Sequence, residues 1–393
     1  MAEQTHDIWN DDDGEAEAEK KSRGPRRFLR FFLILAVVLA VVLAAAYRDG
    51  TGFDVLRRFF SYQGQTEEDP AVYRYDASSN NRFAALGERL VVLSNTGLSI
   101  LDRDGEEVWS TAVSMASPAL AQSGDRAVAY DVGGSELYVL DQDGELLHLT
   151  ANTGEPFIAA NLNEDGYLTV TAQRQTSKGC VSVYDADLDL IFEFNASQRF
   201  VTDACVVGDS HLATVTLGQE AGTFVSNLVI YRLDEEEPAA DYDVTDGLVA
   251  AVTSWGNRLV TVSDTCLTFA GVDGEVEATY SYQGDYLRGY DLNGDGFAAL
   301  LLNRYRSGSV GRLVTVGEDG EEIASLDVNR EVLSISAAGR YLAVLYTDSL
   351  VIYNSDLQEY AVLEGTDYAS DVLMRTDGSA LLLSMEYASL FLP

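Results

Sequence analysis

One short pattern recurs along most of this sequence and constrains its fold more than any other feature: a glycine turn followed by an apolar segment. Successive turn glycines are 37, 42, 42, 48, 40, 43 and 39 residues apart. A period near 40 residues is typical of a propeller whose blades are four-stranded sheets. The spacing therefore predicts an all-β propeller, with eight blades favoured and seven as the alternative. The turn glycines are Gly87, Gly124, Gly166, Gly208, Gly256, Gly296, Gly339 and Gly378.

A second pattern follows each apolar segment. The next apolar segment along the chain ends in an acidic turn, as in DRDG at 102–105, DQDG at 141–144 and EDG at 318–320. Asp and Gly between two apolar runs favour a tight hairpin, because both residues tolerate the positive φ that such a turn requires. We interpret these turns as the links between the third and fourth strands of each blade.

The last unit is incomplete. Its third predicted strand, SLFLP at 389–393, ends the chain before a fourth strand can form. The segment AVYRYD at 71–76 precedes the first unit and has no other assigned partner. Pairing of these two segments would complete the last blade and remove an exposed sheet edge. The sequence therefore predicts that the ring closes between the two ends of the domain.

The N-terminal region contains an uncharged run, FFLILAVVLAVVLAAAY at 31–47, preceded by apolar Phe28 and Leu29. A helix of this length spans about 25 Å, which is close to the thickness of a bilayer core. A cleaved signal peptide is the alternative, but the long acidic region before the run disfavours it. The basic residues before the run place the N-terminus in the cytoplasm by the positive-inside rule. They are Lys20, Lys21, Arg23, Arg26, Arg27 and Arg30.

These observations predict four parts. Residues 1–27 form an acidic-then-basic, disordered cytoplasmic tail, and residues 28–47 form an uncleaved transmembrane helix. Residues 48–70 form a juxtamembrane stem, and residues 71–393 form the β-propeller outside the cytoplasm. The predicted localisation is thus a single-pass protein of the cell membrane.

Charge excludes one class of partner. The formal net charge is −37, and Lys178 is the only lysine after the apolar run. Binding of a phosphate backbone needs a basic stripe, which this sequence lacks, so nucleic acid is not a predicted partner.

Two short motifs suggest chemistry but are incomplete. DLNGDG at 291–296 matches the first half of a calcium loop, yet Ala299 and Leu302 stand where the closing acid is needed. Gly208-Asp209-Ser210 resembles the start of a hydrolase motif, but no histidine follows His211 to activate the serine. We therefore predict no catalytic residues, no cofactor and no metal site.

The candidate binding residues lie in three long loops, which are predicted between the second and third strands of units three, four and six. The loops are 172–179, 217–227 and 303–312, and two of them concentrate basic residues in a domain otherwise poor in them. Such loops share one face of a propeller, and loops on a rigid scaffold often carry function. Solubilising residues on long hairpins are the alternative. The candidates are Arg174, Lys178, Arg304, Tyr305, Arg306 and Arg312.

The stretch SPALAQSGDRAVAYDVGGSELYVLD at 117–141, downstream of one apolar span, resembles a family of uncharacterised bacterial proteins. Members are found mainly in Gram-positive anaerobes and carry a single membrane span and a propeller with WD40-like and quinoprotein-like repeats. The resemblance implies architecture and location and brings no catalytic residues.

Two functions are compatible with this sequence. The first is a non-catalytic interaction or scaffold module at the cell envelope, which binds a protein or another envelope partner. The alternative is an extracellular enzyme or cofactor-binding propeller of quinoprotein-like or carbohydrate-active type. An enzyme needs converging polar groups in a pocket, and no such constellation is evident in the sequence, so we favour the interaction module.

Overall fold

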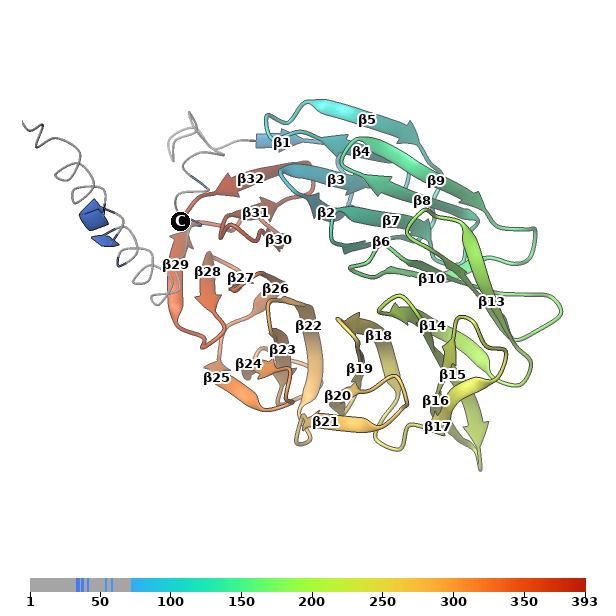
Figure 1. The fold of residues 1–393 in the computed structure, drawn as a ribbon. Coiled ribbons are helices and arrows are strands. Elements are labelled where there is room, and N and C mark those ends of the chain that lie inside the picture. Colours follow the sequence, from blue (N-terminus) through green and yellow to red (C-terminus); the bar gives the residue numbers. More distant parts are fainter. Residues whose placement is uncertain (1–32, 36, 39–40, 42–53, 55–57, 59–71) are drawn as a thin grey trace, which may run out of the picture. The chain divides into compact units, whose positions relative to one another are not determined.

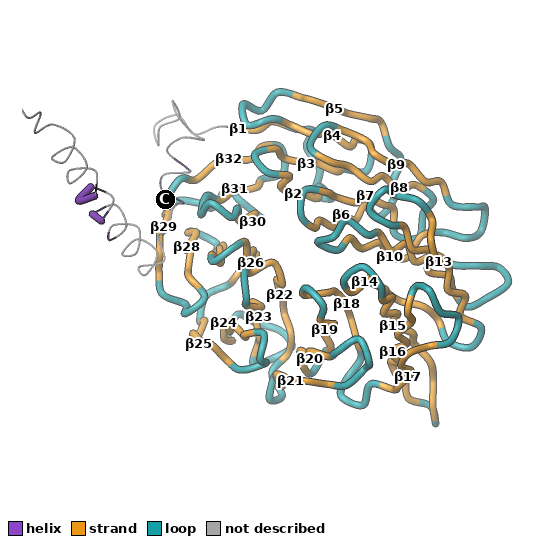
Figure 2. Tube along the Cα trace, in the orientation of Figure 1, coloured by secondary structure: helices purple, strands orange, loops and turns teal. Residues whose placement is uncertain are grey.

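The computed structural model describes residues 33–35, 37–38, 41, 54, 58 and 72–393. Residues Asp54–Pro393 belong to one compact unit. Its strands form eight four-stranded antiparallel sheets, which follow one another around a ring (Figure 1). Strands make up most of each blade and short loops join them (Figure 2). The prediction of an all-β propeller with eight blades is confirmed.

The first four blades each take four consecutive strands. Blade 1 contains β2 (Arg82–Leu86), β3 (Arg89–Leu93), β4 (Gly97–Leu101) and β5 (Glu107–Ala112), and blade 2 contains β6 (Pro118–Ser123), β7 (Arg126–Asp131), β8 (Glu136–Asp141) and β9 (Gly144–Thr150). Blade 3 contains β10 (Phe157–Leu162), β11 (Leu168–Ala172), β12 (Gly179–Tyr184) and β13 (Leu190–Ala196), and blade 4 contains β14 (Phe200–Val207), β15 (His211–Glu220), β16 (Thr223–Arg232) and β17 (Pro238–Asp243).

The next three blades repeat this order, and the eighth does not. Blade 5 contains β18 (Val249–Trp255), β19 (Arg258–Ser263), β20 (Cys266–Ala270) and β21 (Val276–Ser281), and blade 6 contains β22 (Tyr286–Gly294), β23 (Phe297–Asn303), β24 (Gly311–Gly317) and β25 (Glu322–Val328). Blade 7 contains β26 (Val332–Ala338), β27 (Tyr341–Tyr346), β28 (Ser349–Asn354) and β29 (Glu359–Glu364), and blade 8 contains β30 (Asp371–Met374), β31 (Ala380–Leu383), β32 (Tyr387–Phe391) and β1 (Val72–Arg74).

Blade 8 closes the ring in the predicted way. Its outer strand β1 comes from the start of the domain and pairs with β32 from the end of the chain. The register places Tyr73 opposite Ala388 and Arg74 opposite Tyr387. Tyr73 is fully buried and packs with Leu381, Leu383 and Leu390. The two ends of the domain are therefore held together by main-chain pairing and by a buried aromatic side chain.

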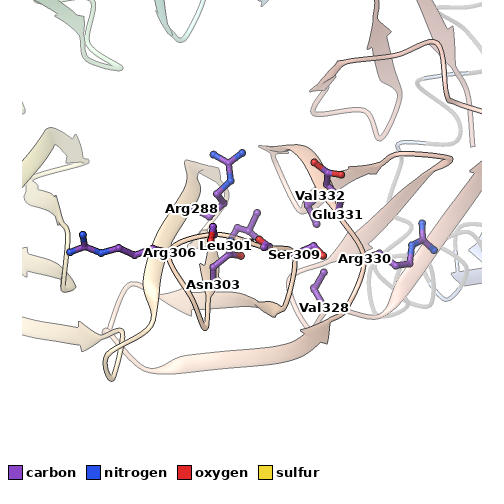
Figure 3. Close-up of a pocket in the computed structure, with 11 residues that line it drawn as sticks. Arg288, Leu301, Asn303, Arg306, Ser309, Val328, Arg330, Glu331 and Val332 are labelled. Atoms are coloured by element: carbon purple, nitrogen blue, oxygen red, sulfur yellow. Dashed lines mark hydrogen bonds between the residues drawn. The ribbon is translucent and has the colours of Figure 1, made fainter.

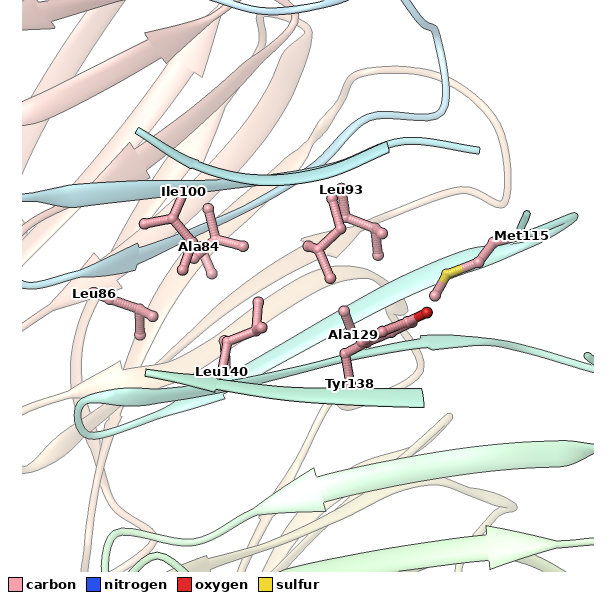
Figure 4. Close-up of a cluster of buried hydrophobic side chains, with 11 residues drawn as sticks. Ala84, Leu86, Leu93, Ile100, Met115, Ala129, Tyr138 and Leu140 are labelled. Atoms are coloured by element: carbon pink, nitrogen blue, oxygen red, sulfur yellow. The ribbon is translucent and has the colours of Figure 1, made fainter. Parts of the chain in front are cut away.

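The hydrophobic core lies between neighbouring blades. Second and third strands such as β3 and β4 are mostly buried, whereas the outer strand β5 is largely exposed. One cluster joins Leu86, Leu93 and Ile100 of blade 1 to Ala129 and Leu140 of blade 2 (Figure 4). Because each sheet buries both of its surfaces against neighbours, its central strands are near-continuous apolar runs. This explains the recurrent apolar segments of the sequence.

The meander of each blade sorts its connections onto two faces. Links between strands one and two and between strands three and four lie on one face, which we call the turn face. Links between strands two and three, and from one blade to the next, lie on the opposite face, which we call the loop face. The glycine turns belong to the turn face, and glycine is suited to them because residues such as Gly87 (φ 63°) and Gly256 (φ 53°) have left-handed backbones.

The predicted membrane segment lies mostly outside the described residues. Among the residues that the structure describes, no helix has the length and apolar character needed to cross a membrane. The predicted tail and most of the predicted stem also lie outside the described residues. The transmembrane helix, the orientation and the four-part division therefore stay predictions.

Candidate functional site

The loop face exposes large apolar side chains. Phe200 is 58% exposed, Phe224 59%, Tyr305 62% and Met385 55%, and all four stand in or beside connections of this face. Tyr368 adds a further partly exposed aromatic. Among the described residues, the exposed large hydrophobic side chains beside turn-face connections are aliphatic, for example Leu190 at 54% and Val276 at 51%. Exposed apolar groups gathered on one face mark interaction surfaces more often than isolated ones do.

Acidic residues, in contrast, are concentrated on the turn face. The turn-face connections 102–106, 185–189 and 233–237 contain three or four acidic residues each. On the loop face, the connections 94–96 and 113–117 contain no charged residue at all. The strongly negative net charge is therefore concentrated away from the exposed aromatic side chains.

The turn face also carries the larger cavity. Its volume is about 1210 Å³, and its lining combines glycine turns with inner-strand residues of several blades. Trp255 lines it and donates from Nε1 to the carbonyl oxygen of Leu292 at 3.0 Å. Most of its charged groups are carboxylates, namely Asp54, Glu88, Asp125, Glu164, Asp291, Asp295, Glu318 and Asp377.

A smaller pocket of about 360 Å³ lies on the loop face, where blade 6 meets blade 7 (Figure 3). One wall is the loop 303–310 between β23 and β24, and another is the connection from β25 to β26. Leu301, Val328 and Val332 give it apolar surface, whereas Asn303 and Ser309 give it polar groups. Its volume is at the lower end of the range for small-ligand sites.

Three arginines stand around this pocket. Figure 3 shows Arg306 and Arg330 pointing to opposite sides and Arg288 standing between them. The Arg306 guanidinium lies 5.5 Å from the centre of the Tyr286 ring. The Arg330 guanidinium lies 4.0 Å from the centre of the Tyr346 ring and pairs with Asp348 at 3.0 Å. An exposed cation–π contact is worth about 0.5–1 kcal/mol, which is less than the 1.5–3 kcal/mol typical of a hydrogen bond to a charged group. A carboxylate in the pocket could therefore draw Arg306 away from Tyr286.

The predicted binding residues fall into two separate groups. Arg174 and Lys178 belong to blade 3, whereas the other four candidates belong to blade 6. Lys178 lies over the Phe200 ring at 4.7 Å. Arg304 and Tyr305 are exposed, and Arg306 lines the pocket. The structure thus places the candidates on one face but does not bring them into one cluster.

Two of the candidates already have acidic partners within the fold. Arg174 pairs with Glu155 at 3.0 Å and with Glu193 at 3.3 Å. Arg312 pairs with Asp285 at 3.0 Å and with Glu322 at 3.5 Å. These guanidinium groups are therefore less available to a partner than those of Arg304 and Arg306.

The start of the compact unit contacts the turn face at blades 7 and 8. Arg58 is 6% exposed, lies 5.7 Å from the centre of the Tyr360 ring and donates from Nη2 to the Tyr360 hydroxyl at 2.7 Å. Asp54 accepts a hydrogen bond from the Tyr341 hydroxyl at 2.9 Å and pairs with Arg340 at 3.5 Å. We call these contacts of Asp54 and Arg58 the stem contacts. They place the point where the chain enters the unit on the turn face.

Residues 61–385 match the model of a family of unknown function, DUF5711. The chain belongs to this family. No curated protein matches the chain in sequence. Family membership therefore agrees with the expected uncharacterised propeller and assigns no activity to this DUF5711 protein.

Several solved structures are similar to this DUF5711 protein. BamB from Moraxella catarrhalis matches with a TM-score of 0.51 and 12% identity, over 81% of this chain and 97% of BamB. A europium-containing methanol dehydrogenase matches with a TM-score of 0.49 and 9% identity, over 80% and 85% of the two chains. U3-55K matches with a TM-score of 0.48 and 8% identity, over 82% and 98%. At such low identity, the likeness to BamB shows a common propeller fold and nothing about activity.

Sequence reasoning missed a set of polar links between the inner strands of this DUF5711 protein. Asn161 donates to Asp203 at 2.6 Å, and Asp203 accepts from the Val252 main chain at 3.0 Å. Asp291, in the rejected calcium motif, accepts from the Ala337 main chain at 2.9 Å. Burial raises the pKa of Asp203 and of Asp291 to about 6. These side chains therefore join adjacent blades.

A signal for these links exists in the sequence. Asn161, Asp203 and Asp291 each stand five residues before the turn glycine of their unit. A polar residue at the same place in several repeats indicates a shared structural role. The two other arginines of the pocket, Arg288 and Arg330, carry no comparable signal, because they stand at the ends of different strands.

Proposed function

We propose that this DUF5711 protein is a non-catalytic interaction module that docks a partner protein on its loop face. The observation that carries the proposal is that exposed Phe200, Phe224, Tyr305 and Met385 all stand at the loop-face ends of blades 4, 6 and 8. Aromatic residues and methionine are enriched where proteins meet, and charged residues are depleted from the centres of such contacts. The loop face exposes aromatic residues and methionine, whereas turn-face connections such as 233–237 are rich in acidic residues.

The closed ring suits a docking role. Each blade packs against two neighbours, so the loops are presented on a scaffold with buried central strands. Loops on such scaffolds bind without large rearrangement, which limits the entropy lost on association. The acidic turn face would repel a negatively charged partner. A partner that approaches the loop face meets the least charge and the most apolar surface.

We further propose that residues 28–47 anchor the protein in the cell membrane, with the N-terminus in the cytoplasm and the propeller outside. The stem contacts support the use of the loop face, because the chain enters the compact unit on the turn face. The stem contacts of Asp54 and Arg58 lie on the turn face and so do not occupy the loop face. A reporter fused after Pro393 should behave as extracytoplasmic, and the mature protein should retain residues 1–46. A cytoplasmic reporter would overturn the anchoring.

An enzymatic role is the second candidate, and one observation favours it. The turn-face cavity combines Trp255 with many carboxylates, which are residue types of carbohydrate-active sites. Such a role predicts that purified protein hydrolyses oligosaccharides and that a Trp255 variant with an intact fold loses the activity. We favour docking because the stem residue Asp54 already occupies part of the cavity wall.

Partner recovery from native membranes tests the docking proposal. The tagged full chain would be compared with the loop-face variant Phe224→Ser/Tyr305→Ser/Met385→Ser. The matched control is a turn-face variant, Asp104→Ser/Asp187→Ser/Glu235→Ser, which alters three exposed residues of the other face. We expect the loop-face variant to lose at least about tenfold in specific recovery and the control to retain it. Equal recovery by both variants would overturn the proposal.

A further inference from the structure

The arginines of this propeller are almost all engaged by acceptors of the same chain. Arg89, Arg174, Arg199, Arg232, Arg258, Arg312 and Arg330 pair with carboxylates, and Arg82 and Arg126 donate to carbonyl oxygens. Among the described residues, no contact with a carboxylate or a carbonyl oxygen is found for five arginines, Arg58, Arg74, Arg288, Arg304 and Arg306, and Arg58 donates instead to the Tyr360 hydroxyl. In a chain with 63 acidic and 26 basic residues, such arginines are the exception.

The position of these exceptions is informative. Arg288 and Arg306 line the loop-face pocket, and Arg304 belongs to the same loop. Arg330, the third arginine of the rim, pairs with Asp348, whose side chain is 70% exposed. Glu331 is the only carboxylate among the lining residues of this pocket, and it projects away from the floor in Figure 3. The pocket therefore has an excess of positive charge.

The lining defines the shape of a ligand. Leu301, Val328 and Val332 offer a short apolar surface, and Asn303 is buried beside it with its amide group hydrogen-bonded to the carbonyl oxygen of Gly308 at 3.0 Å. This hydrogen bond uses a donor of Asn303 and leaves its side-chain oxygen able to accept from a ligand N–H. The arginines supply planar donors that match the two oxygens of a carboxylate.

We propose that this pocket binds the C-terminal carboxylate of a polypeptide whose last residue is aliphatic. The carboxylate would be held by Arg288 and Arg306, and the aliphatic side chain would lie on Leu301, Val328 and Val332. The terminal amide N–H would donate to Asn303. The inference rests on the proposed docking function and assigns the chemistry that the loop face recognises. Inorganic phosphate shares the negative charge but has no apolar group for the floor.

Small probes test the pocket directly. N-acetyl-valyl-valine with a free carboxylate, its C-terminal amide and inorganic phosphate would each be titrated into the purified full chain by ligand-observed NMR. We expect the free acid to bind about tenfold more tightly than the amide, because the amide cannot accept the charge-assisted hydrogen bonds. Phosphate should bind more weakly than the free acid. Added salt should weaken binding of the acid.

Two variants distinguish binding at this pocket from general electrostatic attraction to the protein. Arg288→Ser/Arg306→Ser should weaken binding of the free acid by about tenfold or more. Both side chains are exposed, so the fold should be retained, and a thermal melt would verify this. Arg232→Ser is the control, because it removes a positive charge next to a turn-face connection.

Each result decides the inference. Equal binding of acid and amide, tighter binding of phosphate, or equal losses in the double variant and the control would each overturn it. If the peptide probe does not bind but partner recovery still depends on the loop face, the carboxylate site is wrong and the docking function stands. If partner recovery does not depend on the loop face, the proposed docking function itself is wrong, whatever the peptide probe does.

Discussion

The two faces of this propeller use their connections for different purposes. On the turn face, glycine turns, acidic turns and the stem contacts fix the backbone, and the exposed large apolar groups beside its connections, such as Leu190 and Val276, are aliphatic. On the loop face, connections are more varied in length, and exposed Phe200, Phe224, Tyr305 and Met385 lie in or beside them. The contrast indicates that changes near the turn face and the ring closure should cost stability, whereas changes on the loop face should cost binding.

The largest effect is expected where the ring closes. Tyr73→Ala would empty a site that is fully buried in blade 8, and removal of a large buried aromatic side chain costs about 3–5 kcal/mol. Tyr305→Ala, at a side chain that is 62% exposed, should change the free energy of unfolding by no more than about 0.5 kcal/mol. Denaturant unfolding of both variants measures the difference. Similar midpoints for the two would show that β1 does not close the ring in solution.

Two glycines with the same backbone conformation allow a finer comparison of the faces. Gly378 on the turn face and Gly222 on the loop face both have φ of 86°. A Cβ at Gly378 would lie 2.7 Å from Nη1 of Arg58 and 3.0 Å from Cζ of Tyr341, whereas a Cβ at Gly222 would meet nothing within 4 Å. Gly222→Ala should cost about 1 kcal/mol for the left-handed backbone. Gly378→Ala should cost about 1–2 kcal/mol more, because it disturbs the stem contacts.

A double variant shows whether that extra cost comes from the stem contacts. If Arg58 is the obstacle, Gly378→Ala should cost less in an Arg58→Ala background than in the natural sequence. Gly222→Ala should cost the same in both backgrounds, since its site lies on the other face. Additive effects of Arg58→Ala and Gly378→Ala would mean that residue 58 does not pack on Gly378 in solution.

The parts of the molecule differ in how well the sequence predicts them. The eight blades and their turns were predicted because they depend on local patterns that repeat about every 40 residues, and the pairing of β1 with β32 was predicted because the last repeat lacked its fourth strand. The stem contacts of Asp54 and Arg58 were not, because they join segments about 300 residues apart and no repeat announces them. Of the pocket arginines only Arg306 was a predicted candidate, since Arg288 comes from β22 and Arg330 from the connection between β25 and β26, and only the blade geometry brings them together.

The buried links between inner strands predict an unusual dependence on pH. Asp203 and Asp291 have pKa values of about 6 in the folded protein, against about 3.9 in an unfolded chain. Between about pH 4 and pH 6 the folded state binds more protons than the unfolded state, so stability rises as pH falls through this window and the gain is lost as pH rises through 6. The difference corresponds to at most about 3 kcal/mol for each group.

Thermal melts between pH 5 and pH 8 measure this dependence. Lower pH also relieves repulsion among the many surface carboxylates, so the natural protein should melt higher at pH 5 for two reasons. The melting temperature of Asp203→Asn/Asp291→Asn should rise less between pH 8 and pH 5, because the side chains at these two positions no longer titrate. Asp356→Asn, at an exposed turn residue, should keep the full rise. The same slope in all three proteins would contradict a role for the buried pair.

The smallest effect on stability, and the largest on binding, is expected for the basic residues of the loop face. Lys178→Ser/Arg304→Ser/Arg306→Ser should change the free energy of unfolding by no more than about 0.5 kcal/mol for each exposed residue. Arg174 and Arg312 are left unchanged because their ion pairs with Glu155 and Asp285 belong to the fold. Recovery of an anionic partner should fall, and the remaining binding should depend less on salt, since fewer charges are screened. Unchanged recovery with an unchanged salt dependence would mean that these side chains only solvate the hairpins, and that docking on the loop face relies on its aromatic residues alone.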